Sequence, residues 1–126
     1  MAQTMVDKIY DFNTMCDRIK ELDPNIRFAG VIDERGKLVA GGMRKKQVSL
    51  TDTKTDEMRY LELTLRVKMR KDFDQYFGKA KYITTRRKKV NVMSCPINSD
   101  TLLRFTEPDI DLCNLVERIY DTAQTY

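Results

Sequence analysis

The 126-residue sequence has no histidine and no tryptophan, and only three cysteines, three prolines and five glycines. Without histidine it lacks the commonest general base and the commonest zinc ligand in proteins. Cys16, Cys95 and Cys113 are far apart and odd in number, so we expect reduced thiols rather than disulfides. No apolar run reaches the ~18–20 residues of a membrane-spanning helix. The N-terminus also lacks the basic start and apolar run of a signal peptide.

Motifs that cradle nucleotides or build acyl-transfer sites are missing as well, since GxGxxG, GxxxxGK[ST] and GxSxG do not occur. Carboxylates are numerous, but they gather at predicted helix starts and turns, where capping and solvation explain them. The sequence therefore predicts a protein that is not an enzyme and that needs no cofactor or metal ion.

The composition is that of one small basic globular domain. Hydrophobic residues make up 41% of the chain and charged residues 33%, with 23 Lys and Arg against 19 Asp and Glu and a net charge of +4. This length supports a single hydrophobic core, and no linker divides it. We expect one domain over residues 1–126.

Apolar periodicity and turn residues predict the order helix, two strands, helix, three strands, helix. The segment 5–22 has one apolar stripe at helical spacing, and Gly36 suits the turn of a hairpin. Both alternating sets of residues 26–33 are apolar or small, so we expect this strand to be covered on both faces. The predicted elements are helices over 5–22, 55–77 and from 109 on, and strands over 26–33, 37–43, 79–86, 88–95 and 101–106. Short loops favour hairpins, hence an α+β fold with a five-stranded, mainly antiparallel sheet flanked by three helices.

The middle helix carries two apolar stripes on roughly opposite sides. The broader stripe consists of Met58, Leu61, Leu65, Met69, Phe73 and Tyr76, and the narrower one of Tyr60, Leu63 and Val67. A helix on one sheet face needs only one stripe, so we expect the narrower stripe to be left over as the centre of a self-associating surface. The alternative is that a neighbouring helix or the 44–54 loop covers it within the monomer.

Two basic clusters are candidate sites for anions. Arg86, Arg87, Lys88 and Lys89 fall at a predicted hairpin tip, and Arg44, Lys45 and Lys46 follow the first hairpin. Such clusters bind phosphates, anionic lipid, nucleic acid or an acidic protein face. The alternative is a solvated hairpin end whose charge protects a sheet edge. With a net charge of only +4 and no nucleic-acid-binding motif, nucleic acid is the less favoured partner.

The order of elements and the hairpin over residues 28–40, FAGVIDERGKLVA, resemble the roadblock/dynein-light-chain family, which has a profilin-like fold. The resemblance implies homodimers or heterodimers formed through the middle helix and the neighbouring edge strand. Members serve as platforms for small GTPases, motor complexes or signalling assemblies, without catalytic residues of their own. The chain is also similar to small archaeal proteins of unknown function, which implies a cytoplasmic setting. On this chain the implied interface consists of Tyr60, Leu63, Val67, Tyr82, Ile83 and Thr84.

We therefore expect a non-enzymatic, dimeric scaffold or regulatory module with a small GTPase or signalling complex as partner. Two alternatives stay open. One is a sensory module of the PAS-like or profilin-like kind, which predicts a small-ligand cavity between the sheet and a helix. The other is binding of nucleic acid or an anionic surface through the basic hairpin.

Overall fold

The structure is a computed structural model, and it describes residues 4–44, 50–108 and 112–125, with Leu112 and Cys113 described by their backbone alone. Within these ranges the chain forms a five-stranded sheet in the order β2-β1-β5-β4-β3. Every neighbouring pair is antiparallel, which confirms the predicted sheet. The strands are β1 (Ile26–Ile32), β2 (Leu38–Met43), β3 (Ile83–Arg86), β4 (Asn91–Ile97) and β5 (Asp100–Thr106).

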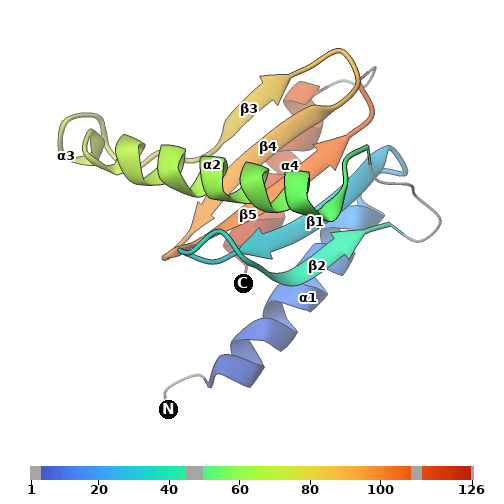
Figure 1. The fold of residues 1–126 in the computed structure, drawn as a ribbon, viewed down its shortest axis with the longest axis horizontal. Coiled ribbons are helices and arrows are strands. Elements are labelled where there is room, and N and C mark those ends of the chain that lie inside the picture. Colours follow the sequence, from blue (N-terminus) through green and yellow to red (C-terminus); the bar gives the residue numbers. More distant parts are fainter. Residues whose placement is uncertain (1–3, 45–49, 109–111, 126) are drawn as a thin grey trace.

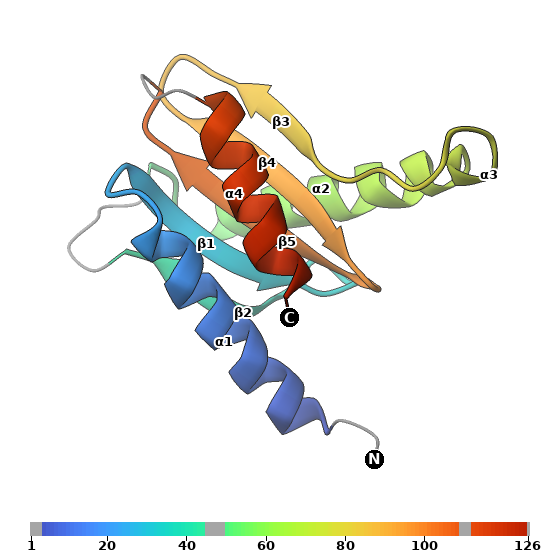
Figure 2. The ribbon, with the colours of Figure 1, turned by 180° about the vertical axis from the view of Figure 1, so that it is seen from behind.

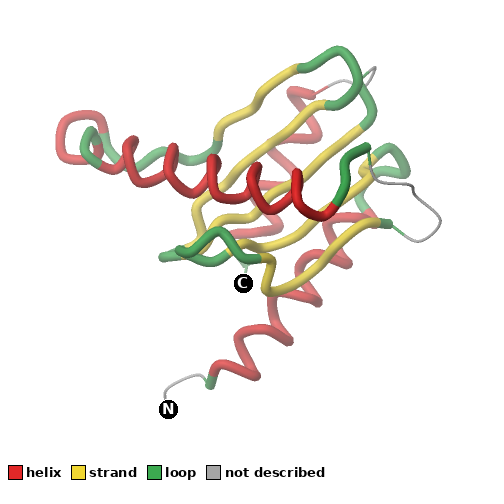
Figure 3. The backbone as a smooth tube through the Cα atoms, in the orientation of Figure 1, coloured by secondary structure: helices red, strands yellow, loops and turns green. Residues whose placement is uncertain are grey.

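The helices lie on both faces of the sheet (Figures 1 and 2). Helices α1 (Met5–Glu21) and α4 (Leu112–Gln124) cover one face, and α2 (Thr53–Lys71) crosses the other. The predicted α+β class and order of elements are confirmed. The middle helix is shorter than predicted, because it ends at Lys71 and a separate turn, α3 (Asp74–Phe77), follows. The C-terminal end of α2 and all of α3 extend past the strands (Figure 3).

The larger part of the core lies between the sheet and the helices α1 and α4. The α1 stripe of Phe12, Met15, Cys16 and Ile19 is buried there. A smaller cluster lies between the sheet and α2. Strand β1 supplies both clusters: Ala29 and Val31 belong to the larger one, Phe28 and Ile32 to the smaller one. Burial of β1 on both faces, predicted from its two apolar sets, is therefore confirmed.

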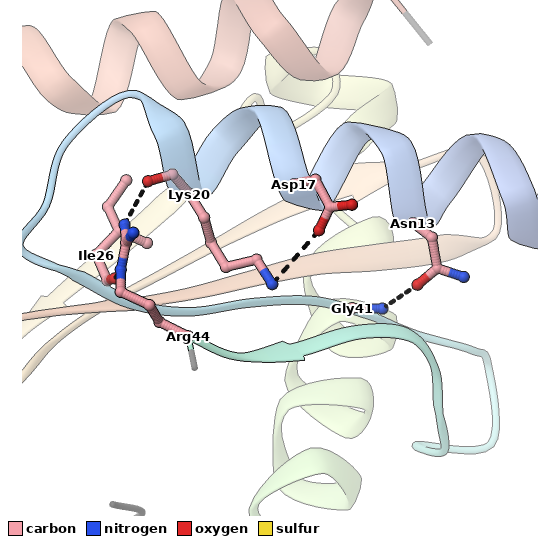
Figure 4. A network of polar contacts seen from close by, with 6 residues as sticks. All are labelled: Asn13, Asp17, Lys20, Ile26, Gly41 and Arg44. Atoms are coloured by element: carbon pink, nitrogen blue, oxygen red, sulfur yellow. Dashed lines mark hydrogen bonds and ion pairs between the residues drawn. The ribbon is translucent and has the colours of Figure 1, made fainter. Parts of the chain in front are cut away.

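Helix α1 sits close to β2 because Gly41 has no side chain. The Gly41 N–H donates to Asn13 Oδ1 at 2.8 Å (Figure 4). The residue has a φ of +77°, and an added Cβ would lie 2.2 Å from Ala29 O and 2.9 Å from Cys16 Sγ. Both the backbone conformation and the packing therefore require glycine here.

We expect Gly41→Ala to lower the free energy of unfolding by roughly 3 kcal/mol, because strain and a backbone clash add up. Gly42→Ala is the matched control, since Gly42 also has a positive φ but an added Cβ meets nothing within 4 Å. The Gly42→Ala variant should lose only about 1 kcal/mol of its free energy of unfolding. Urea unfolding of the three proteins measures the difference. Equal losses would contradict the close packing of Gly41 against Ala29 of β1 and Cys16 of α1.

Candidate functional site

Helix α2 packs on the sheet through a narrow stripe of side chains. Tyr60 is only 9% exposed and Thr64 is buried. The Tyr60 ring stacks on Phe28 with a centroid separation of 6.5 Å, and Leu63 packs against the same cluster. The Thr64 hydroxyl donates to Tyr60 O at 2.9 Å. Burial raises the pKa of the Tyr60 phenol, with a smaller contribution in the same direction from Asp56.

The prediction that the stripe of Tyr60, Leu63 and Val67 is left over was wrong, because Tyr60 is buried against its own sheet and Leu63 packs beside it. Val67 is half-buried on the same side. The physical reason is the close approach of the β1–β2 turn. A Cβ on Gly36 would lie 3.1 Å from Leu61 Cα, so the helix backbone itself abuts the turn. With the helix backbone this close to the turn, Tyr60 and the small Thr64 are the side chains that are buried beneath the helix. The broader stripe of larger side chains faces outward instead.

The broader apolar stripe lies on the outer side of α2 and continues into α3. We call it the outer stripe. Its side chains are between 51% and 84% exposed. No described segment of this chain covers them. The outer stripe consists of Met58, Leu61, Leu65, Met69, Phe73, Tyr76 and Phe77. In its last part the ring centroids of Phe73 and Phe77 are 6.4 Å apart, as are those of Tyr76 and Phe77.

Charge is distributed unevenly between the two halves of α2. The first half holds all the acidic residues of the helix, together with Lys54 and Arg59, and Asp52 is its N-cap. One ion pair joins the halves, between Arg66 Nε and Glu62 Oε1 at 3.3 Å. If a second copy of α2 packed antiparallel to the first, the acidic residues in the first half of each helix would therefore lie beside the basic residues in the second half of the other. The acidic residues are Asp56, Glu57 and Glu62, and the charged residues of the second half are all basic, namely Arg66, Lys68, Arg70 and Lys71.

Strand β3 is an edge of the sheet, since it pairs with β4 alone among the described strands. Its Ile83 is half-buried and Thr84 is exposed. Tyr82, just before the strand, packs on the α4 side, with its ring centroid 5.7 Å from that of Tyr120. The Tyr82 hydroxyl donates to Glu117 Oε1. Of these three predicted interface residues, Thr84 is the one most accessible at the open edge.

The predicted basic cluster after the first hairpin is not a free anion site at Arg44. Its guanidinium donates to the carbonyls of Lys20 and Ile26, the latter at 2.9 Å (Figure 4). It also donates to Asp23 O at 3.0 Å. Arg44 therefore holds the α1–β1 connection against the end of β2. Sequence alone could not show this, because the acceptors are backbone groups 18 to 24 residues away. Lys45 and Lys46 lie outside the described residues.

The second basic cluster is solvent-exposed at the β3–β4 connection. Arg86 ends β3, and Arg87, Lys88 and Lys89 follow it before Val90. The Arg87 N–H donates to Val90 O at 3.0 Å, which closes the hairpin. The side chains of this cluster are available to solvent, in contrast to Arg44.

Arg104 is a buried cation that sequence analysis missed, because it reads as one polar residue in a strand. It is fully buried in the central strand β5, where Nη1 donates to Thr106 Oγ1 at 2.8 Å. Within the described part of the chain, its Nε and Nη2 have no hydrogen-bond partner. Desolvation lowers its pKa to about 10. Its complete burial makes it part of the core rather than of an accessible site.

Among the described residues, the cysteines and carboxylates do not form a reactive or metal-binding site. Cys16 and Cys95 are buried, and desolvation raises their pKa to about 12 and about 11, so both thiols stay protonated at neutral pH. Across residues 4–44, 50–108 and 112–125, no group of three His, Cys, Asp or Glu side chains is placed to hold a metal ion. None of the helices described is long and apolar enough to cross a membrane.

We expect Arg44→Met to lower the free energy of unfolding by about 2 kcal/mol, because several charge-assisted hydrogen bonds to carbonyls are lost. Arg87→Met is the matched control, since it removes the same charge from an exposed position and should cost less than ~0.5 kcal/mol. Urea unfolding at constant salt compares the two variants. Equal effects would mean that Arg44 is only a solvated surface charge.

Comparison with known proteins supports this architecture. No curated protein matches the chain. The solved structure of gliding protein MglB from Thermus thermophilus is similar, with a TM-score of 0.72 at 7% identity, covering 99% of this chain and 93% of that one. A structure of MglB with tetrameric arrangement gives a TM-score of 0.72 at 8% identity, over 99% and 90% of the two chains.

A Roadblock/LC7 domain from Streptomyces avermitilis has a TM-score of 0.66 at 8% identity, covering 90% of this chain and 92% of that one. These likenesses confirm the predicted roadblock-like, profilin-like fold. One family model matches residues 5–124, and its description is a family of unknown function, DUF6659. The chain therefore belongs to the DUF6659 family and has a fold similar to that of roadblock domains.

Proposed function

We propose that this protein is a non-enzymatic regulatory or scaffold module that works as a dimer, with the outer stripe of α2 at the centre of the interface. The observation that carries the proposal is the exposure of seven large apolar side chains along one side of α2 and α3. Monomeric proteins rarely expose a contiguous apolar patch of this kind, whereas interfaces bury one. The likeness of the fold to MglB and to a Roadblock/LC7 domain supports a module of this class.

A second copy of the chain is the occupant that fits the outer stripe. A two-fold axis near the middle of α2 would place two of these helices antiparallel, so that each stripe faces itself. The acidic residues in the first half of one helix would then lie beside the basic second half of the other. A parallel arrangement would instead bring Arg66, Lys68 and Arg70 against their own copies, at a cost in repulsion.

The open edge of β3 extends this interface. Unpaired backbone groups on an edge strand favour pairing with another strand, and a second β3 would supply it. In this arrangement Ile83 and Thr84 lie at the junction, while Tyr82 holds the strand through its contacts on the α4 side. The stripe predicted as the interface then acts indirectly, by seating α2 so that its outer stripe faces the partner.

We expect the parent protein to sediment as a dimer and Leu61→Asp with Leu65→Asp to give a folded monomer. Two buried carboxylates facing their copies should weaken association at least roughly a hundredfold. Val6→Asp with Tyr10→Asp is the matched control, because both residues are exposed apolar positions on α1. That variant should keep the mass of the parent. A monomeric parent, or an unchanged mass for the α2 variant, would refute the interface.

A small GTPase is the partner that the roadblock resemblance implies, and we propose that the dimer serves as its platform in the cytoplasm. The free thiols of Cys16 and Cys95 are compatible with a reducing compartment. A regulatory platform must distinguish the GDP-bound and GTP-bound states of its partner, since a protein that binds both states with equal affinity does not change the equilibrium between them.

A small GTPase purified from the same organism tests this partnership when it is loaded with GDP or with a non-hydrolysable GTP analogue. We expect the immobilised dimer to bind one loaded state at least roughly tenfold more tightly than the other. The variant carrying Leu61→Asp and Leu65→Asp should bind more weakly, because the platform is lost. Equal affinity for both states, measured by interferometry, would exclude a regulatory role toward that GTPase.

A further inference from the structure

A cleft of about 570 Å³ lies between the C-terminal half of α2 and the edge of the sheet at β3 and β4. Val67 lines it from α2, and Ile83, Ser94 and Pro96 line it from the two strands. Tyr120 of α4 also contributes to the lining. The volume is in the range of ~300–1,000 Å³ found for small-molecule sites. The cleft is thus large enough for a small ligand and has an apolar surface against which one can pack.

The charged side chains of this cleft are strongly unbalanced. Four cations line it and a single carboxylate, Asp74, offsets them; the cations are Arg70, Lys71, Lys79 and Lys81. Within the described part of the chain, none of the four takes part in an ion pair. Clustered like charges beside a low-dielectric surface raise the local potential and attract anions.

Helix stability explains only part of this cluster. Arg70 and Lys71 lie in the last turn of α2, where a cation interacts favourably with the helix dipole. Lys79 and Lys81 are not in a helix. They come after Gly78, whose φ of +80° lets the chain turn back from α3 toward β3. The turn therefore brings two further cations to the same cleft, with Lys81 Nζ 6.0 Å from the Tyr120 ring centroid.

We propose that this cleft binds a small organic phosphate carrying at least two negative charges. The guanidinium fork of Arg70 and the ammonium groups of the lysines suit phosphate oxygens. The apolar surface from Ile83 and Pro96 accommodates the organic part of the ligand. This site goes beyond the proposed dimer and differs from its outer stripe, because the cleft lies on the sheet-facing side of α2 and the outer stripe on the other. Ile83 is the residue that the cleft shares with the proposed β3 junction.

Calorimetric titration at low salt with ADP, inorganic pyrophosphate and adenosine tests the assignment. ADP should bind more tightly than pyrophosphate, because only ADP also has an organic part for the apolar surface. Adenosine, which lacks the charge, should not bind measurably. Raising the salt to about 0.5 M should weaken ADP binding, because the attraction is screened. Failure of both ADP and pyrophosphate to bind, or citrate binding as tightly as ADP, would overturn the proposal.

Paired charge variants locate the site. Lys79→Gln with Lys81→Gln should weaken ADP binding roughly tenfold, as expected for the loss of two exposed charge contacts. Lys88→Gln with Lys89→Gln removes the same charge from the exposed β3–β4 connection and should leave the affinity within about twofold. Equal losses in the two double variants would mean that ADP responds to overall charge and not to the cleft. Circular dichroism of each variant checks that the fold is kept.

Discussion

The packing of Tyr60 against Phe28 of β1 is the contact on which the surface chemistry of this protein depends. It sets the rotation of α2 about its own axis, since the Tyr60 ring stacks on Phe28 and the helix backbone abuts Gly36. Once that rotation is set, the positions of all other α2 side chains follow from the helical repeat of 3.6 residues. The outward direction of the outer stripe and the position of Val67 in the cleft both follow from this rotation.

The two faces of the sheet differ in how much of the hydrophobic core they hold. The face under α1 and α4 holds the larger cluster, with the tight approach at Gly41 and the Arg44 hydrogen bonds closing its ends. It supplies most of the buried apolar surface and hence most of the stability. The α2 face holds a smaller cluster and leaves the helix accessible on both flanks. Because α2 contributes few side chains to the core, most of its side chains stay exposed.

The outer stripe and the cleft lie on opposite sides of α2, and the two proposals share Ile83, which lines the cleft and lies at the proposed β3 junction. A second copy of the chain would cover the outer stripe, whereas a phosphate ligand would occupy the space between the helix and the strands β3 and β4. Both would add contacts to a helix that the rest of the chain holds through few side chains. Linkage makes any coupling between such sites reciprocal: whatever ligand binding does to dimerisation, dimerisation does to ligand binding.

Local patterns were sufficient for the order of elements, the antiparallel sheet, the hairpin turn at Gly36 and the two-sided burial of β1, because each depends on neighbours in the chain. They also indicated that the middle helix has two apolar sides. Periodicity gives the angle between the two stripes but not which of them faces the sheet. The narrower stripe, which the sequence predicts to be left over, is the one that packs on the sheet. Packing between segments far apart in sequence decided which stripe faces the sheet. It also decided that Arg44 donates to distant carbonyls and that Arg104 is buried. Shape complementarity of this kind has no signature in a single linear pattern.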